Sequence, residues 1–170
     1  MVYDSIIIGK GPAGISASIY LKRANCNVLV IGKDGGALEK TSAIDNYYGF
    51  SNTITGKELL QQGLEQAQRL EIDIETDEVV SIEKEDYFIV ETRNNQYQTK
   101  TVILATGANR NTPKIKGIKE LEGKGVSYCA ICDAFFYRNK KVAVLGSRRL
   151  CLKRGKNTFT SSKICYDFNK

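Results

Sequence analysis

The fold is decided by Ser5-Ile6-Ile7-Ile8-Gly9-Lys10-Gly11-Pro12-Ala13-Gly14, a stretch close to the N-terminus. Its β-branched run before Gly9 is typical of a buried strand, and residues 14–24 place small and apolar side chains at helical spacing. A second apolar run, Asn27–Ile31, follows this helix. Such a run is typical of a parallel strand buried on both faces, so residues 5–31 are predicted to form a βαβ unit with a right-handed crossover.

The glycines of this stretch have the spacing G-x-G-x-x-G, directly after the predicted strand and at the start of the predicted helix. Gly9 permits a tight turn, Gly11 lets the backbone approach a pyrophosphate, and Gly14 lets helix and strand pack closely. The helix N-terminus adds free N–H groups and the positive end of its dipole. The sequence therefore predicts a dinucleotide site, and the alternative is a glycine turn that binds nothing.

The second predicted strand lacks the acidic residue that usually follows it. In dinucleotide-binding units an acidic side chain about 20 residues after the turn holds the ribose. Here Gly32 ends the strand and Asp34 follows two residues later. The ribose contact is therefore predicted to fall to Asp34 or to backbone groups of residues 33–36.

Further along the chain, a helix and several short strands are predicted. Thr55-Gly-Lys-Glu58 predicts a capping box for a helix that runs to about Leu70, after a loop over Gly32–Ser51. Four β-favouring segments between residues 72 and 104, separated by polar turns, predict a small antiparallel insertion that begins at Ile72. The last apolar run, 101–105, ends at Thr106-Gly107.

The C-terminal part of the sequence predicts the start of a second unit. Residues 113–125 are rich in lysine and glycine, which is typical of a connection between domains. Lys141–Gly146 is similar to the first strand and predicts a fresh buried strand that enters a second α/β unit.

Composition excludes several classes of function. The 170 residues are 42% hydrophobic and 26% charged, which predicts an ordinary folded core. Of the 25 Lys and Arg residues and 19 Asp and Glu residues, residues 147–170 hold seven basic residues and one acidic residue, Asp167. Because the first 146 residues are neutral, the net charge of +6 gives no argument for nucleic acid as a partner.

Histidine is absent, which excludes Ser-His-Asp and Cys-His catalysis and His-ligated metals. Five cysteines without a signal peptide indicate a reducing, cytoplasmic setting, and no run is long enough to span a membrane.

A Cys-x-x-Cys pair, Cys129-Ala-Ile-Cys132, precedes Asp133. Such a pair can cycle between dithiol and disulfide and so transfer electrons by thiol-disulfide exchange. Structural zinc is one alternative, but it needs four ligands, and only Cys26, Cys151 and Cys165 remain in a chain without histidine. Two buried, inert cysteines are the other alternative.

The order of motifs resembles the low-molecular-weight thioredoxin reductase family of FAD-dependent pyridine nucleotide-disulfide oxidoreductases. The resemblance covers residues 1–146, from the Gly9–Gly14 turn through Asp45–Phe50 and Ala105–Ala108 to the Cys-x-x-Cys pair. It implies an α/β fold, with a Rossmann-like FAD-binding domain over residues 1–112 and the start of an NAD(P)-binding domain over residues 113–146. Thioredoxin is the implied partner, neither nucleic acid nor membrane is implied, and family members are expected to form homodimers.

The resemblance also implies roles for individual residues. Cys132 would accept electrons from the flavin, Cys129 would exchange with the thioredoxin disulfide, and Asp133 would donate or accept the proton. The residues implied to hold FAD are Gly9, Gly11, Pro12, Ala13, Gly14, Gly32, Lys33, Asp34, Gly35, Gly36, Leu38, Asn46, Thr106, Gly107 and Ala108. The alternatives to this function are another electron donor, such as ferredoxin, or an inert fragment that binds flavin or nucleotide.

The family pattern stops after Gly146. A second glycine fingerprint for NAD(P)H would need glycine where Arg148 stands. A one-nucleotide shift in permitted codons for residues 148–155 would read Gly-Asp-Tyr-Ala-Leu-Lys-Glu, which restores the fingerprint. Residues 147–170 are therefore interpreted as a frameshifted or truncated tail, and the chain as an incomplete reductase.

Overall fold

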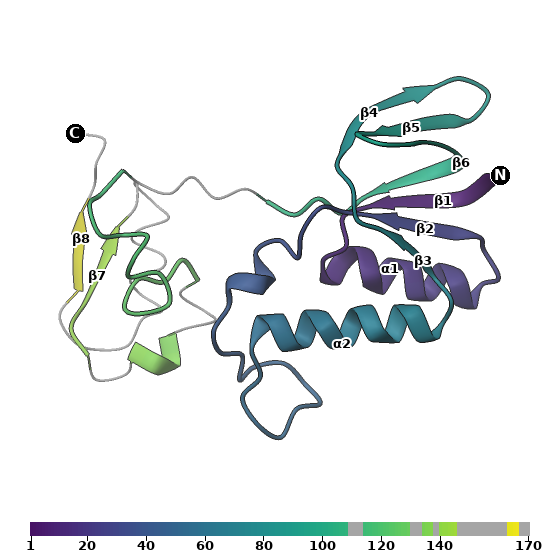
Figure 1. Cartoon of the computed structure of the whole chain (residues 1–170). Coiled ribbons are helices and arrows are strands. Elements are labelled where there is room, and N and C mark those ends of the chain that lie inside the picture. The colour runs from purple at the N-terminus through teal and green to yellow at the C-terminus, as the bar shows by residue number, and fades with distance from the viewer. Residues whose placement is uncertain (109–113, 130–133, 138–139, 146–162, 167–170) are drawn as a thin grey trace. The chain divides into compact units, whose positions relative to one another are not determined.

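The computed structural model describes residues 1–108, 114–129, 134–137, 140–145 and 163–166. The chain divides into two compact units, Met1–Asn111 and Thr112–Lys170. The first unit contains a six-stranded sheet and two α-helices, and the described part of the second contains a two-stranded sheet (Figure 1).

The six-stranded sheet has the order β3-β2-β1-β6-β5-β4. Its first four strands in that order are parallel, and β5 and β4 continue the sheet in antiparallel pairing. The predicted βαβ unit is confirmed, because β1 and β2 pair in parallel with Ile6 opposite Leu29. The strands are β1 Val2–Ile8, β2 Val28–Ile31, β3 Asp73–Glu75, β4 Val79–Lys84, β5 Phe88–Thr92 and β6 Gln96–Leu104.

The expectation of an antiparallel insertion that begins at Ile72 is wrong in two respects. The first segment, β3, pairs in parallel with β2 and so belongs to the parallel sheet. The last segments form one nine-residue strand, β6, which pairs with β5 near its start and with β1 along most of its length. The prediction fails because a strand of three residues has too little side-chain pattern to reveal its partner. The antiparallel extension of the sheet consists of β5 and β4.

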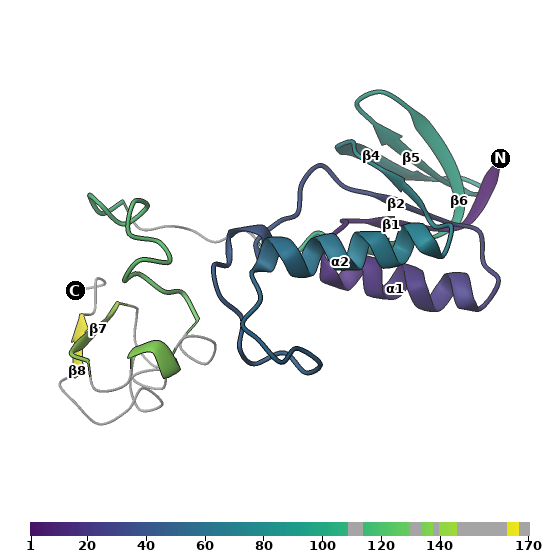
Figure 2. The ribbon, with the colours of Figure 1, turned by 60° about the horizontal axis from the view of Figure 1, so that its bottom comes forward.

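Two helices, α1 Pro12–Arg23 and α2 Gly56–Arg69, lie side by side along one face of the sheet (Figure 2). Alternate strand residues meet them: Ile7, Val28 and Val30 pack with Ile15 of α1 and Ala67 of α2. The neighbouring strand positions face the other way and pack with β5 in a second cluster, formed by Ile6, Ile8, Leu29, Ile31 and Val90. Both faces of β1 and β2 are therefore buried, which explains their unbroken apolar runs.

The capping box of α2 is confirmed. Thr55 accepts a hydrogen bond at Oγ1 from the Glu58 backbone N–H (3.2 Å), and the Thr55 backbone N–H donates to Glu58 Oε2 (2.8 Å). Two backbone N–H groups at this helix start are thereby satisfied.

The described part of the second unit contains the 3-10 helix η2 Ala134–Tyr137 and the strands β7 Val142–Leu145 and β8 Lys163–Tyr166. β7 and β8 pair in parallel. The strand predicted over 141–146 is therefore present, but the expectation that it is buried is wrong, because Ala143 is exposed and Val142 and Val144 are only half-buried.

Candidate functional site

The candidate site lies where the parallel strands end. Backbone hydrogen bonds join the carboxyl ends of these strands directly. The Gly9 N–H after β1 donates to the Ile31 carbonyl of β2 (2.7 Å), and the Ala105 N–H after β6 donates to Ile8 (2.8 Å). The Gly32 N–H after β2 donates to the Glu75 carbonyl of β3 (3.1 Å). In open α/β sheets, ligands bind outside this edge.

Two glycines of the first turn are required by close packing. Gly9 has φ +117°, and a Cβ on it would lie 2.2 Å from the Ala105 carbonyl oxygen. A Cβ on Gly14 would lie 1.8 Å from the Gly9 carbonyl oxygen. Both positions therefore exclude a side chain, as the sequence predicts for the turn and for helix-strand packing.

Gly11 differs, because no described atom lies within 4 Å of a Cβ built on it. It is the N-cap of α1, in an extended conformation with φ −76°, and has no side chain to cap the helix. The first turn of α1 also contains no acidic residue, whereas α2 begins with a capping box. An open turn at an uncapped helix N-terminus fits a diphosphate, since both backbone N–H groups and dipole favour an anion. The residues present therefore fit the pyrophosphate of FAD.

The loop after β2 is folded on itself. Gly32 needs its missing side chain, because a Cβ there would lie 2.7 Å from the Lys10 backbone nitrogen. Asp34 is exposed and accepts a hydrogen bond at Oδ1 from the Gly36 N–H (2.9 Å), which stabilises the turn at Gly36 (φ +66°). Gly35 is buried, and its N–H donates to Glu39 Oε2 (3.3 Å).

The Lys33 side chain is part of an ion-pair network. Its Nζ donates to Glu78 Oε1 (3.0 Å), and Arg93 contacts the other Glu78 oxygen (2.7 Å). Hydrogen bonds from Lys33 and then Arg93 lower the pKa of Glu78, and the Glu78 bond raises the pKa of Lys33. This ion-pair network fastens the loop after β2 to the turn between β5 and β6.

The remaining predicted flavin contacts are spread over two segments. Thr106, Gly107 and Ala108 are exposed directly after β6, beside the Gly9 turn that touches Ala105. Leu38 begins the 3-10 helix η1 Leu38–Lys40 and is half-buried. Asn46 is exposed in the loop between η1 and α2.

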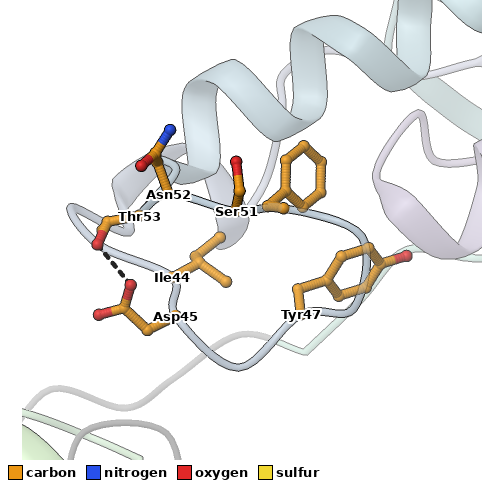
Figure 3. A pocket seen from close by; sticks show the side chains of 7 residues that line it. Ile44, Asp45, Tyr47, Ser51, Asn52 and Thr53 are labelled. Atoms are coloured by element: carbon orange, nitrogen blue, oxygen red, sulfur yellow. Dashed lines mark hydrogen bonds between the residues drawn. The ribbon is translucent and has the colours of Figure 1, made fainter.

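That loop forms a shallow pocket of about 280 Å³ (Figure 3). Paired backbone hydrogen bonds between Ile44 and Ile54 join the two arms of the loop, and Thr53 donates a hydrogen bond to Asp45. Typical ligand pockets have volumes of about 300–1,000 Å³, and this pocket is smaller, so it does not enclose a dinucleotide by itself. It is lined by Ile44, Asp45, Tyr47, Phe50, Ser51, Asn52 and Thr53, without Asn46.

In the second unit the described residues include one member of the Cys-x-x-Cys pair. Cys129 is half-buried and disulfide-bonded, and its backbone N–H donates to Ser127 Oγ (3.2 Å). Cys132 and Asp133 lie outside the described residues, as do Arg148 and most of the tail. Cys26, in the first unit, is a free thiol.

Sequence reasoning missed two residues at the strand ends, Lys10 and Thr76. Lys10 Nζ donates to Thr76 Oγ1 (2.9 Å), directly after β3. Lys10 occupies the first variable position of the glycine fingerprint, and a lysine at that position is the sequence signal from which its place at the strand ends could be predicted.

Residues 3–147 match the family described as pyridine nucleotide-disulphide oxidoreductase. The chain belongs to this family. A thioredoxin reductase of Ureaplasma parvum is 44% identical over 150 residues, which cover 86% of this chain and 48% of the relative. One of Bacillus subtilis is 37% identical and is matched over 91% of this chain and 49% of its own.

Solved structures of oxidoreductases resemble this chain as well. The crystal structure of thioredoxin reductase from Streptococcus pyogenes superposes with a TM-score of 0.86 at 35% identity, covering 91% of this chain and 51% of that one. The predicted resemblance and the α/β fold class are therefore confirmed. The chain spans about half the length of the curated relatives it matches.

Two features are absent from the part of the chain that the structure describes. No helix there is long and apolar enough to cross a bilayer. Within the same residues, no three Cys, Asp or Glu side chains gather as metal ligands.

Proposed function

We propose that this oxidoreductase chain provides the flavin-binding and disulfide-carrying part of a thioredoxin reductase, which passes electrons from NAD(P)H through FAD to a protein disulfide. The observation that carries the proposal is the open Gly11 turn at the uncapped start of α1, in a chain of this family with a disulfide-bonded Cys129. Thioredoxin is the proposed partner, because the curated relatives are named thioredoxin reductases.

The first unit binds and orients the cofactor. Gly11 and the N–H groups of Ala13 and Gly14 hold the pyrophosphate, residues 32–36 and Leu38 border the adenosine, and Asn46 and residues 106–108 border the flavin. When bound, FAD supplies two-electron transfer between a nicotinamide and a disulfide.

The Cys-x-x-Cys pair carries the electrons onward. Two electrons and one proton convert a Cys129–Cys132 disulfide into a Cys129 thiolate and a Cys132 thiol, with Asp133 as the donor of that proton. The Cys129 thiolate then attacks one sulfur of the partner disulfide and releases the other as a thiolate. Asp133 then accepts the Cys132 thiol proton, and the Cys132 thiolate attacks the Cys129 sulfur. This restores the intramolecular disulfide and releases the partner's second sulfur as a thiolate, and both partner thiolates take up protons from water to give a dithiol.

Flavin binding and redox titration test the proposal. We expect the purified chain to take up added FAD and to absorb light at about 450 nm, as protein-bound flavins do. Reductive titration of the loaded chain should consume one more electron pair than Cys129→Ser, which keeps its flavin. Cys26→Ser removes a free thiol of the first unit and is the matched control, so it should titrate like the unaltered chain.

Two outcomes contradict the proposal at different points. A chain that stays colourless with excess FAD has no flavin function. Equal electron uptake by the unaltered chain and Cys129→Ser, with flavin bound to both, leaves a flavin-binding module without a redox disulfide.

A further inference from the structure

Lys10 is held across the carboxyl ends of three parallel strands. It stands between Gly9 and Gly11 after β1, and its Nζ donates to Thr76 Oγ1 after β3 (2.9 Å). Between these ends its stem crosses Gly32, where a Cβ would lie 2.9 Å from Lys10 Cγ and 3.3 Å from Lys10 Cβ. The absence of a side chain at Gly32 is therefore what makes room for this lysine.

The ammonium group of Lys10 has capacity left for a ligand. Lysine has three N–H donors, and Thr76 accepts one of them. Lys33 and Lys100 are ion-paired to carboxylates, whereas in the described part of the chain no carboxylate lies within ion-pair distance of Lys10. Lys10 is half-buried, and a neutral hydroxyl holds the end of its side chain, so the cation is positioned without a carboxylate partner.

The Lys10 side chain passes over the position where such units usually place an acidic residue. In a dinucleotide-binding βαβ unit, a carboxylate at the end of the second strand accepts hydrogen bonds from the ribose hydroxyls. Here that place is Gly32, covered by the Lys10 stem, and Asp34 is exposed and hydrogen-bonded to Gly36. The side chain that crosses this position therefore ends in a hydrogen-bond donor in place of an acceptor.

We propose that Lys10 is a further cofactor-binding residue, which donates from Nζ to the ribose hydroxyl oxygens of the adenosine half of the dinucleotide. This inference rests on the proposed flavin-binding function. Thr76 is a positioning residue, because it holds the ammonium group at the strand ends without touching the nucleotide. Hydrogen bonds from a charged donor are stronger than neutral ones, so loss of Lys10 should be measurable in nucleotide affinity.

The test compares ADP with 2′-deoxy-ADP and 3′-deoxy-ADP as probes, on the whole chain and on Lys10→Met, by calorimetry or by displacement of FAD. We expect Lys10→Met to bind ADP about tenfold more weakly. The unaltered chain should prefer ADP over at least one deoxy analogue several-fold, and Lys10→Met should lose that preference. Thr76→Val should give an intermediate loss of ADP affinity, because the Lys10 ammonium group is still present but no longer held by a hydrogen bond.

Lys22→Met is the matched control. Lys22 lies at the other end of α1 and also donates one hydrogen bond to a neutral acceptor, the Glu71 carbonyl (2.7 Å). It should bind ADP like the unaltered chain. Urea unfolding of all three variants checks that each is folded at the assay temperature.

Distinct results overturn the inference and the function on which it rests. If the chain binds FAD and Lys10→Met binds ADP equally well, Lys10 has no role in binding. If Lys10→Met weakens ADP and both deoxy analogues by the same factor, Lys10 contacts phosphate and the ribose assignment is wrong. A chain that binds neither FAD nor ADP refutes the proposed function, and this inference with it.

Discussion

At the scale of single residues, the glycines of the first turn have opposite surroundings although they share one motif. Gly14 faces the Gly9 carbonyl, and Gly11 faces open space. The sequence predicted both roles from spacing alone, since the fingerprint assigns close packing to one glycine and ligand approach to another. It could not predict the Lys10 contact with Thr76, because these residues are 66 positions apart in the chain.

This difference predicts opposite effects of the same substitution. Gly14→Ala should destabilise the chain by about 2 kcal/mol or more, because its Cβ would overlap a backbone oxygen that cannot move aside. Gly11→Ala should cost no more than about 1 kcal/mol, because φ −76° suits alanine and only the preference for glycine over alanine at an N-cap is lost, but it should weaken FAD binding. Urea unfolding and FAD titration of both variants measure this. Equal loss of stability in the two would contradict the assigned surroundings.

Glu78 predicts a pH dependence of stability. Its pKa in the folded chain is held below the ordinary value of 4.5, first by Lys33 and then by Arg93. The unfolded chain therefore binds the proton at higher pH, so the stabilisation is present above pH 4.5 and is lost as pH falls through the folded pKa. We expect unfolding free energy to fall over this acidic range, and less steeply in Glu78→Gln. A Glu78→Gln profile as steep as that of the unaltered chain would exclude this contribution.

At the scale of elements, the helices were the more predictable part. The capping box at Thr55 and Glu58 and the period of apolar residues place α2 at Gly56–Arg69, close to the predicted extent. These signals are local, since a cap and an amphipathic face are both read within one helix. The pairing of strands is not local, and so the sequence pattern places β3 in the antiparallel part of the sheet although it pairs in parallel with β2.

The cap predicts a moderate loss of stability on substitution. Thr55→Ala removes the acceptor of the Glu58 N–H and should lower the free energy of unfolding by about 1 kcal/mol. Thr55→Ser keeps the oxygen and should stay close to the unaltered chain. Thermal or urea unfolding of the two variants distinguishes a capping effect from a general loss at this position.

At the scale of the whole molecule, the charge is unevenly distributed. The first 146 residues are neutral, and the net charge of +6 arises in residues 147–170. The family match ends at residue 147, next to the position where Arg148 replaces the expected glycine. Most of this tail lies outside the described residues, so its interpretation depends on the coding sequence.

The frameshift hypothesis predicts one extra nucleotide in the coding DNA across codons 146–149. Sequencing that region together with the transcript measures it directly. An unambiguous run without an extra nucleotide would refute the hypothesis, and Arg148 would then be the native residue at this position.

The βαβ unit, the glycine turn, the helix cap and the family can be predicted from the sequence, because each depends on residue type and spacing within a short segment. The strand with which β3 pairs and the two strands with which β6 pairs follow instead from the tertiary structure. So does the path of Lys10 across Gly32 to Thr76. These are contacts between distant segments, and their geometry arises only when the parallel strands end side by side.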